Sequence, residues 1–279
     1  MSRQTTKIGL MFAGTLIGAH AQWLNYPAAG TPRTRDGKPN LSAKAPRAAN
    51  GKPDLSGVWL TEYSPPGENG FNASLNYAVV PGDDPRTFSK YVLNILADFK
   101  PEESPMRPEA AEILRTRLPA QNPSAHCLPH SVARADIHSY APFKIVQTPG
   151  EMVFLYEIDG THRQVYTDGR KLPKDPQPSW LGYSVGRWEG ETLVIDTAGF
   201  NDKSWLDSAG HPHSEALRIE ERFHRRDFGH MDLKLTVDDP KMYTKPFSIE
   251  VAEVLQADSD ILENICLEDE RDLAHLPRR

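Results

Sequence analysis

The sequence lacks the motifs that identify a cofactor or a familiar catalytic machinery. It has no phosphate-binding loop, no dinucleotide fingerprint, no Gly-x-Ser-x-Gly elbow and no Cys-x-x-Cys pair. After residue 21 it has no apolar run long enough to span a membrane. These absences argue against the corresponding enzyme classes, and they predict a protein with no cofactor and no membrane span.

The first residues have the pattern of a secretory signal peptide. Arg3 and Lys7 precede an apolar stretch from Ile8 to Ala19, and Ala19-His20-Ala21 is a small-residue cleavage pattern. The stretch is too short to cross a bilayer. We therefore expect cleavage after Ala21, a periplasmic or secreted protein, and no contribution of residues 1–21 to the fold.

Positive charge and cysteine are both scarce. Without Arg3 and Lys7, 30 basic residues face 38 acidic ones, a net charge of −8, which disfavours nucleic acid or an anionic membrane as a partner. Cys127 and Cys266 are the only cysteines. An oxidising compartment favours a disulfide between them, and two unpaired buried thiols are the alternative.

The chain divides into an arm and a β-rich domain. Residues 22–56 are rich in Pro, Gly, Lys and Asn, and Arg33–Ser42 is echoed 14 residues later by Arg47–Ser56. Two copies are too few for a solenoid, so this segment is interpreted as an extended arm on the surface. Residues 57–279 are expected to form one domain, with helices at Phe88–Phe99 and Pro108–Leu118 in an insertion at about 86–118.

Short alternating segments with turn signals between them predict an all-β, mostly antiparallel fold. Gly57-Val58-Trp59 opens the first strand, a hairpin forms around Glu189-Gly190, and residues 247–255 supply the last strand. Eight or nine strands indicate a lipocalin-like barrel or a curved sandwich.

Two further hairpins predict which side chains face the interior. Pro149-Gly150 sets Thr148 opposite Glu151, and Asp159-Gly160 sets Ile158 opposite Thr161. The expected inward residues of these strands are Phe143, Ile145, Gln147, Met152, Phe154, Tyr156, Arg163 and Val165. Arg163 would then lie beside Tyr156, as an inward cation.

The hairpin of residues 216–225 and 230–237 is constrained by alternation in both strands. The odd positions Leu217, Ile219 and Phe223 face the odd apolar positions of the second strand, Met231 to Val237, and Glu221 is the polar exception between Ile219 and Phe223. A loop of Arg226–Phe228 with a left-handed Gly229 would pair odd with odd. On the outer face it would pair Arg222 with Asp232, Glu220 with Lys234, and His224 with His230.

Several segments resemble an exported bacterial family. They include Gln22–Pro27, Gly51–Trp59 (GKPDLSGVW), Tyr166–Arg170, Trp180–Thr197 (WLGYSVGRWEGETLVIDT) and Gly210–Leu217. The resemblance covers nearly the whole mature chain and implies export without implying an activity. The Gly57-x-Trp59 pattern also resembles the lipocalin and calycin superfamily, which implies a barrel that holds a small apolar ligand.

The inward polar residues are the candidate catalytic site. An isolated buried charge is costly, so Glu221 must meet a cation or take a raised pKa. As an acid or base it would work with Arg163 or Tyr156, which would hold developing negative charge, while Gln147 contacts the substrate. The alternative is a structural ion pair in a satisfied core network. Aromatic residues that would line the pocket, or else pack in the core and rim, are Trp180, Tyr183, Trp188 and Trp205.

Histidines offer a metal-binding alternative. His211 and His213, with Glu215 nearby, have a spacing that can ligate zinc or iron, but no third histidine joins them. His126 and His130 suggest a similar site, which a disulfide at Cys127 would oppose. The segments 168–170 and 207–210 are interpreted mainly as turns, with a functional role for Asp168 or Arg170 as the alternative.

These patterns favour an exported β-barrel that acts on a small organic molecule. The first hypothesis is a cofactor-independent lyase, isomerase or hydratase with Glu221 as acid or base. The second is a non-catalytic, lipocalin-type ligand-binding protein. The third is a metal-dependent hydrolase or oxygenase centred on His211 and His213.

Overall fold

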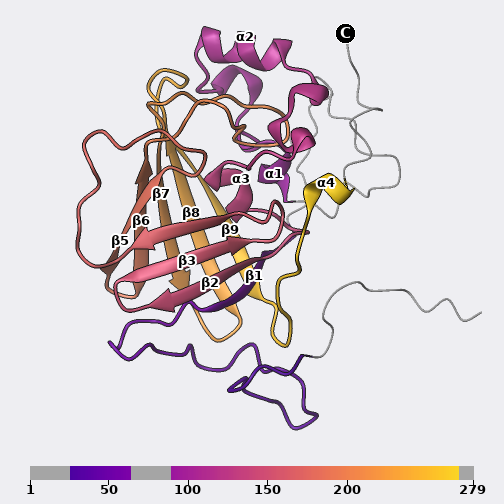
Figure 1. Cartoon of the computed structure of the whole chain (residues 1–279), viewed down its shortest axis with the longest axis vertical. Helices are drawn as coiled ribbons and strands as arrows, with labels where there is room; N and C mark the ends of the chain where they lie inside the picture. Colours follow the sequence, from indigo (N-terminus) through magenta and orange to yellow (C-terminus); the bar gives the residue numbers. More distant parts are fainter. Residues whose placement is uncertain (1–25, 64–88, 270–279) are drawn as a thin grey trace, which may run out of the picture.

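The computed structural model describes residues 26–63 and 89–269 (Figure 1). The predicted signal peptide and Phe88, the first residue of the predicted helix at Phe88–Phe99, therefore lie outside the described residues. No helix within the two described ranges combines the length and apolar composition needed to cross a bilayer.

The described strands close into a β-barrel in which each strand pairs with the next along the chain and the last pairs with the first. All pairs are antiparallel except β4 with β5, which are joined by the long connection 167–182. The predicted all-β class is confirmed, and the fold is a barrel rather than a sandwich. The strands are β1 (Gly57–Thr61), β2 (Phe143–Thr148), β3 (Glu151–Tyr156), β4 (His162–Tyr166), β5 (Tyr183–Glu189), β6 (Thr192–Ala198), β7 (Arg218–Arg225), β8 (His230–Asp238) and β9 (Phe247–Leu255).

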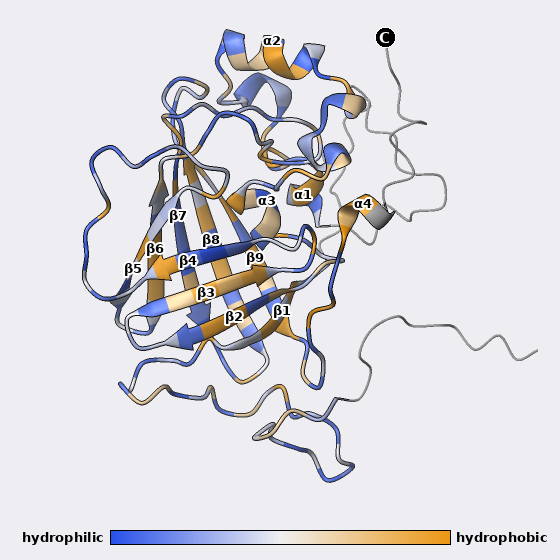
Figure 2. Ribbon diagram, in the orientation of Figure 1, coloured by the Kyte–Doolittle hydropathy of each residue, from blue (hydrophilic) through white to orange (hydrophobic). Residues whose placement is uncertain are grey.

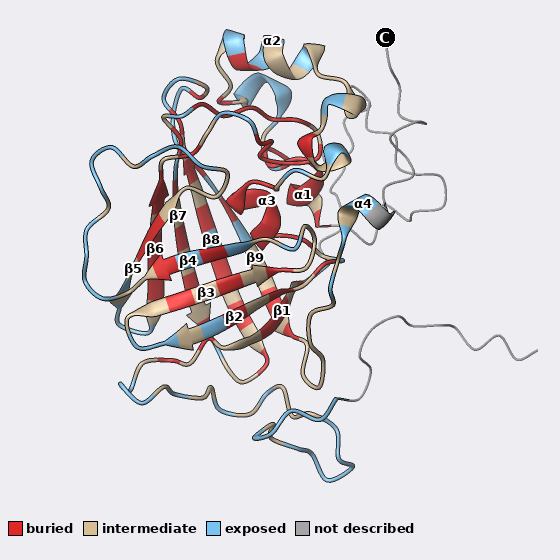
Figure 3. Ribbon diagram, viewed as in Figure 1, coloured by how far each residue is buried: buried red, intermediate tan, exposed pale blue. Residues whose placement is uncertain are grey.

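The barrel interior is a packed core built by alternation along the strands. In β8, Met231, Leu233, Leu235 and Val237 are at most 1% exposed, while the residues between them reach the outer surface. Figures 2 and 3 show the same alternation of apolar buried and polar accessible positions in the neighbouring strands. Successive side chains of a strand point to opposite faces, so this pattern fixes which residues face inward.

The register around β3 agrees with the prediction on one side and differs on the other. Thr148 faces Glu151, as the Pro149-Gly150 turn predicts. Across β3 and β4, however, Arg163 faces Phe154 rather than Tyr156, a shift of two residues. The loop is longer than predicted because the Asp159 carboxylate accepts bonds from the backbone and side chain of Thr161. A shift of two keeps the same faces inward, so Arg163 is still directed into the barrel.

The hairpin of β7 and β8 is also shifted by two. Phe223 faces Leu233 and His224 faces Asp232, so the predicted outer pairs, including His224 with His230, are wrong. Odd positions still face odd positions. The turn is set by the Asp227 carboxylate, which accepts bonds from the backbone N–H groups of residues 229 and 230.

Gly229 does not have the left-handed conformation predicted for it. Its lack of a side chain matters for another reason, because a Cβ there would overlap Leu41 of the N-terminal segment. Close approach of the two backbones is visible in the bond from the Gly229 N–H to the Leu41 carbonyl at 2.7 Å. Glycine is therefore needed here for packing.

Helices gather at one end of the barrel (Figure 1). Of the two predicted helices, the second is confirmed as α2 (Pro108–Thr116), whereas the first is reduced to the single turn α1 (Lys90–Leu93). It ends there because the Asn94 side chain accepts the Leu96 N–H and the Asp207 carboxylate accepts the Ile95 N–H. The remaining helical elements are η2 (Pro101–Glu103), η3 (Pro119–Gln121), η4 (Pro123–His126), α3 (Val132–Asp136) and α4 (Cys266–Asp269).

The repeated N-terminal segment lies along the opposite end of the barrel (Figure 1). In both copies an arginine binds the carbonyl of a glycine four residues later and a carboxylate of the barrel domain. Both glycines have φ near +80°, at +82° and +79°. The groups concerned are Arg33 with Gly37 and Asp258, and Arg47 with Gly51 and Glu191.

The predicted disulfide is confirmed. Cys127 and Cys266 are bonded, with their Cα atoms 5.5 Å apart and a sequence separation of 139. The bond ties the segment that follows β9 to the connection between η4 and α3.

Candidate functional site

A bidentate ion pair lies at the centre of the polar cluster inside the barrel. Arg163 on β4 donates from Nη1 and Nη2 to the two carboxylate oxygens of Glu221 on β7, at 2.7 and 2.8 Å. Both side chains are fully enclosed, at 1% and 0% exposure. Both residues were predicted to face inward, and the structure brings them together as a buried bidentate pair.

Asp136 joins this pair from outside the sheet. It ends α3, on the side of the barrel covered by helices (Figure 1), and its Oδ2 lies 3.6 Å from Arg163 Nη2. The hydroxyl of Tyr156 donates to the other oxygen, Oδ1, at 2.7 Å. Tyr156 is therefore part of the cluster, as expected, but it reaches Arg163 through Asp136.

A third buried carboxyl group, Glu253, comes from β9. It is 0% exposed, and the Thr61 hydroxyl donates to its Oε1 at 2.8 Å. Thr61 also links this group to the helical side, because its Oγ1 lies 3.4 Å from the Asp136 carbonyl oxygen. The barrel thus contains three buried carboxyl groups among the described residues of this cluster, and two of them, Glu221 and Asp136, lie beside Arg163.

Burial decides the charge of these groups. Loss of solvation raises the pKa of Asp136 well above its ordinary value, and the neighbouring Glu221 carboxylate raises it further, while Arg163 opposes both. Burial likewise raises the pKa of Glu253 well above 4.5, opposed by the bond from Thr61. Burial by itself would lower the pKa of Arg163, but the carboxylate of Glu221 raises it. Burial therefore favours the protonated, uncharged forms of Asp136 and Glu253 near the Arg163–Glu221 ion pair.

His138 follows Asp136 by two residues, and its backbone adjoins the cluster through Thr61. It is 1% exposed, and its backbone carbonyl accepts the Thr61 N–H at 3.3 Å. Its ring packs edge-on against His130 at 5.2 Å between centroids. Burial lowers the pKa of His138 well below 6.5, so the ring is neutral near pH 7.

This cluster contains buried polar atoms that make no hydrogen bond within the described structure. They are Asp136 Oδ2, Glu253 Oε2, Arg163 Nε, His138 Nδ1 and His138 Nε2. Such atoms are rare in folded proteins, because each carries a desolvation cost of roughly 1–3 kcal/mol. Two neutral acids that can donate a proton and one neutral imidazole that can accept one form a set suited to acid/base chemistry.

The predicted substrate-binding residues are not gathered around Glu221. Gln147 is engaged at the opposite end of the barrel, where its amide accepts the Leu55 N–H at 2.8 Å and donates to the Pro53 carbonyl at 3.1 Å. Tyr183 and Trp188 occupy opposite faces of β5, so they do not line one pocket. Trp188 packs on the core, whereas the Tyr183 ring packs on Tyr166 at 5.3 Å between centroids.

The other predicted aromatic and turn residues have local partners. Trp180 is half-buried, and Trp205 packs under the guanidinium of Arg117 at 5.1 Å. Asp168 and Arg170 form a tight turn in which the carboxylate accepts both the backbone and the side chain of Arg170. These contacts fit the turn interpretation of that segment.

His211 and His213 lie close in sequence but bind different groups. His211 Nδ1 is 2.5 Å from Asp207 Oδ2, and His213 Nε2 is 2.7 Å from the hydroxyl of Ser204. His126 Nε2 lies 2.8 Å from the Ala120 carbonyl oxygen. Within the described residues, no group of three or more His, Cys, Asp or Glu side chains has an arrangement that fits a metal ion.

Sequence reasoning missed Asp136, Glu253 and His138. Strand alternation could have predicted the inward position of Glu253, because this residue lies on the same odd face of β9 as Phe247, Ile249 and Leu255. Asp136 and His138 follow no strand pattern, since they belong to α3 and the residues after it. Only the tertiary placement of that segment against the barrel brings them to the site.

Comparison of the chain with models of protein families, with curated proteins and with solved structures found no match. The assignment of function therefore depends on the geometry of the site.

Proposed function

We propose that this protein is an exported β-barrel enzyme that transforms a small organic molecule by acid/base catalysis without a cofactor, as a lyase, isomerase or hydratase. The observation that carries the proposal is the pair of buried carboxyl groups, Asp136 and Glu253, each with an oxygen that makes no hydrogen bond within the described residues. Burial raises the pKa of both groups, which favours their protonated forms. The Cys127–Cys266 disulfide supports export.

The proposed roles follow from charge and geometry. Glu221 is held by both Nη atoms of Arg163, which favours a structural and positioning role for it over that of the titrating group. Asp136, oriented by the Tyr156 hydroxyl, is the proposed acid, and it donates its proton from Oδ2 to a carbonyl or hydroxyl oxygen of the substrate. A protonated buried carboxylic acid is an effective donor to a developing oxyanion.

The proposed base is the neutral ring of His138. Both of its nitrogens lack a partner, so one of them is free to accept a proton from carbon or from water. Glu253 supplies a second donor through Oε2. The guanidinium of Arg163, held in position by Glu221, lies 3.6 Å from Asp136 Oδ2 and stabilises negative charge as it develops there.

A non-catalytic ligand-binding protein is the second candidate. It is supported by the buried polar atoms of the cluster that make no hydrogen bond within the described residues. On this hypothesis the unpartnered atoms bind a polar ligand and no bond is made or broken. No feature of the described residues favours the metal-dependent alternative.

Incorporation of deuterium from heavy water into a panel of small carbonyl and hydroxy compounds, followed by NMR, tests the proposal. Asp136→Asn and Glu253→Gln keep the shape of the neutral acids but remove the transferable proton, so each should reduce exchange at least ~100-fold. The matched control is Glu250→Gln, which alters an exposed carboxylate on the outer face of β9.

The control should exchange at the wild-type rate. If the wild-type protein binds a compound of the panel but catalyses neither exchange nor hydration of any, the enzyme proposal is wrong and the ligand-binding candidate replaces it.

A further inference from the structure

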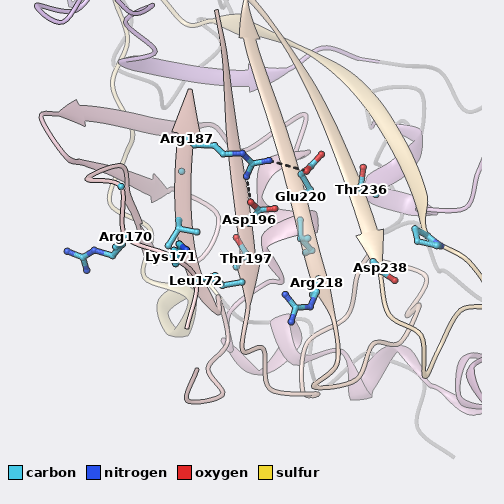
Figure 4. A pocket seen from close by; sticks show the side chains of 15 residues that line it. Arg170, Lys171, Leu172, Arg187, Asp196, Thr197, Arg218, Glu220, Thr236 and Asp238 are labelled. Carbon is cyan, nitrogen blue, oxygen red and sulfur yellow. Dashed lines mark hydrogen bonds and ion pairs between the residues drawn. The ribbon is translucent and has the colours of Figure 1, made fainter. Parts of the chain in front are cut away.

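A groove of about 690 Å³ lies on the outside of the barrel, away from the polar cluster (Figure 4). Its floor is the outer face of β5, β6, β7 and β8, and its walls are the segment 169–172 and Pro246. A volume of this size falls within the range of sites for small organic ligands.

At one end of the groove the cations are paired with carboxylates. Arg187 forms ion pairs with Asp196 and with Glu220, the latter at 3.7 Å, and Figure 4 shows these three side chains joined across β5, β6 and β7. Arg170 is also paired, with Asp168, and in Figure 4 its side chain points out of the groove. These groups leave little charge for a ligand to bind.

The other end has two cations with no partner. Neither Lys171 nor Arg218 forms an ion pair or a side-chain hydrogen bond within the described part of the chain, and both are exposed. Asp238 is the cross-strand neighbour of Arg218, but the guanidinium points toward Leu172 and away from Asp238 (Figure 4). A groove with free lysine and arginine groups attracts an anion.

Apolar surface adjoins these cations. Leu172 is half-buried beside Arg218, and Val185, only 8% exposed, forms part of the floor. A ligand that matches the groove therefore has an anionic head and an apolar body. An inorganic anion would leave the apolar wall uncovered, and an uncharged apolar compound would leave the cations unpaired.

We propose that this groove is a binding site for a small organic anion, an apolar carboxylate or sulfonate. Its charged head binds Arg218 and Lys171, and its apolar body lies on Leu172 and Val185. The site is separate from the interior cluster. An experiment that disproves binding in this groove therefore leaves the proposed acid/base function untouched, and the reverse also holds.

Fluorescence titration with anilinonaphthalene sulfonate tests this site, because its uncharged analogue phenylnaphthylamine has the same apolar body without the anionic head. The sulfonate should bind the wild-type protein more tightly than the analogue. Arg218→Gln and Lys171→Gln should each weaken sulfonate binding about five- to tenfold, the effect of losing one partly exposed charge contact.

Arg222→Gln is the matched control, since Arg222 lies on the same outer face of β7 but is paired with Glu189 and does not line the groove. It should change the affinity less than about twofold. Methyl signals of Leu172 and Val185 should shift on titration. No binding to the wild type, equal binding of the analogue, or unchanged affinity in both groove variants would overturn the proposal.

Discussion

Arg163 and Glu221 meet inside the barrel through both guanidinium Nη atoms and both carboxylate oxygens, at 2.7 and 2.8 Å. Replacing Glu221 with Gln removes the charge with little change of shape and leaves a buried guanidinium whose nearest carboxyl is Asp136, 3.6 Å away. Breaking one side of a buried pair is strongly destabilising, so we expect Glu221→Gln to lower the free energy of unfolding by ~3–5 kcal/mol. Urea denaturation measures it.

Glu220→Gln is the control, because Glu220 is the preceding residue of β7 and its side chain is 37% exposed on the outer face. Its effect should be about 0.5 kcal/mol or less. A Glu221→Gln protein with wild-type stability and no turnover would instead make Glu221 a catalytic group, as the sequence analysis first suggested.

The inward positions of Arg163 and Glu221 were predictable because strand alternation has a period of two. The predicted registers of the β3–β4 and β7–β8 hairpins were wrong by two residues, whereas that of β2–β3 was right, and an even shift leaves every side chain on its predicted face. The shifts themselves arise from turn carboxylates, Asp159 and Asp227, that bind backbone N–H groups and change the loop length. Such side-chain bonds are not visible in a hydrophobic pattern.

The rest of the site depends on tertiary placement. Asp136 and His138 come from a short helix and its end, and nothing local to residues 132–138 indicates that they face the barrel interior. For Gln147 the direction of the side chain could be predicted but its partners could not. Its inward direction was predicted, but its partners are backbone groups of the N-terminal segment, which no strand pattern includes.

The raised pKa of Glu253 predicts a specific dependence of stability on pH. In the unfolded chain this group ionises near 4.5, whereas burial keeps it protonated in the folded state at higher pH. Above that value the folded state binds more protons, so its stability should fall as the pH rises, by up to ~1.4 kcal/mol per pH unit, until the folded pKa is reached. Below 4.5 the full contribution is present.

Glu253→Gln cannot ionise in either state. Its free energy of unfolding, measured by urea denaturation between about pH 5 and pH 8, should therefore fall less steeply than that of the wild type. Glu250→Gln, exposed on the outer face of the same strand, should keep the wild-type slope. Parallel curves for the wild type and Glu253→Gln would show that Glu253 is ionised in the folded protein.

The Cys127–Cys266 bond should contribute substantially to stability. It closes a loop with a sequence separation of 139 residues, and the chain-entropy relation gives about 5 kcal/mol for a loop of that length. We expect the double variant Cys127→Ser, Cys266→Ser to lose stability of this order in urea denaturation. Reduction of the wild-type protein should reproduce the loss, and reduction of the double variant should have no effect. If the urea midpoint of the double variant equals that of the wild type, the disulfide anchors only the segment after β9 and does not stabilise the barrel.

A substitution of His138 is expected to have different effects on stability and on activity. Both of its ring nitrogens are buried without a partner, an arrangement that lowers stability and that folding alone does not require. Phenylalanine has a similar planar shape and no polar atoms, so His138→Phe should unfold with a free energy equal to or up to ~2 kcal/mol above that of the wild type at pH 7. The same change removes the proposed base, and deuterium exchange should fall at least ~100-fold. Loss of stability in His138→Phe, with exchange retained, would mean that the imidazole has a structural partner and that the proton acceptor is a different residue.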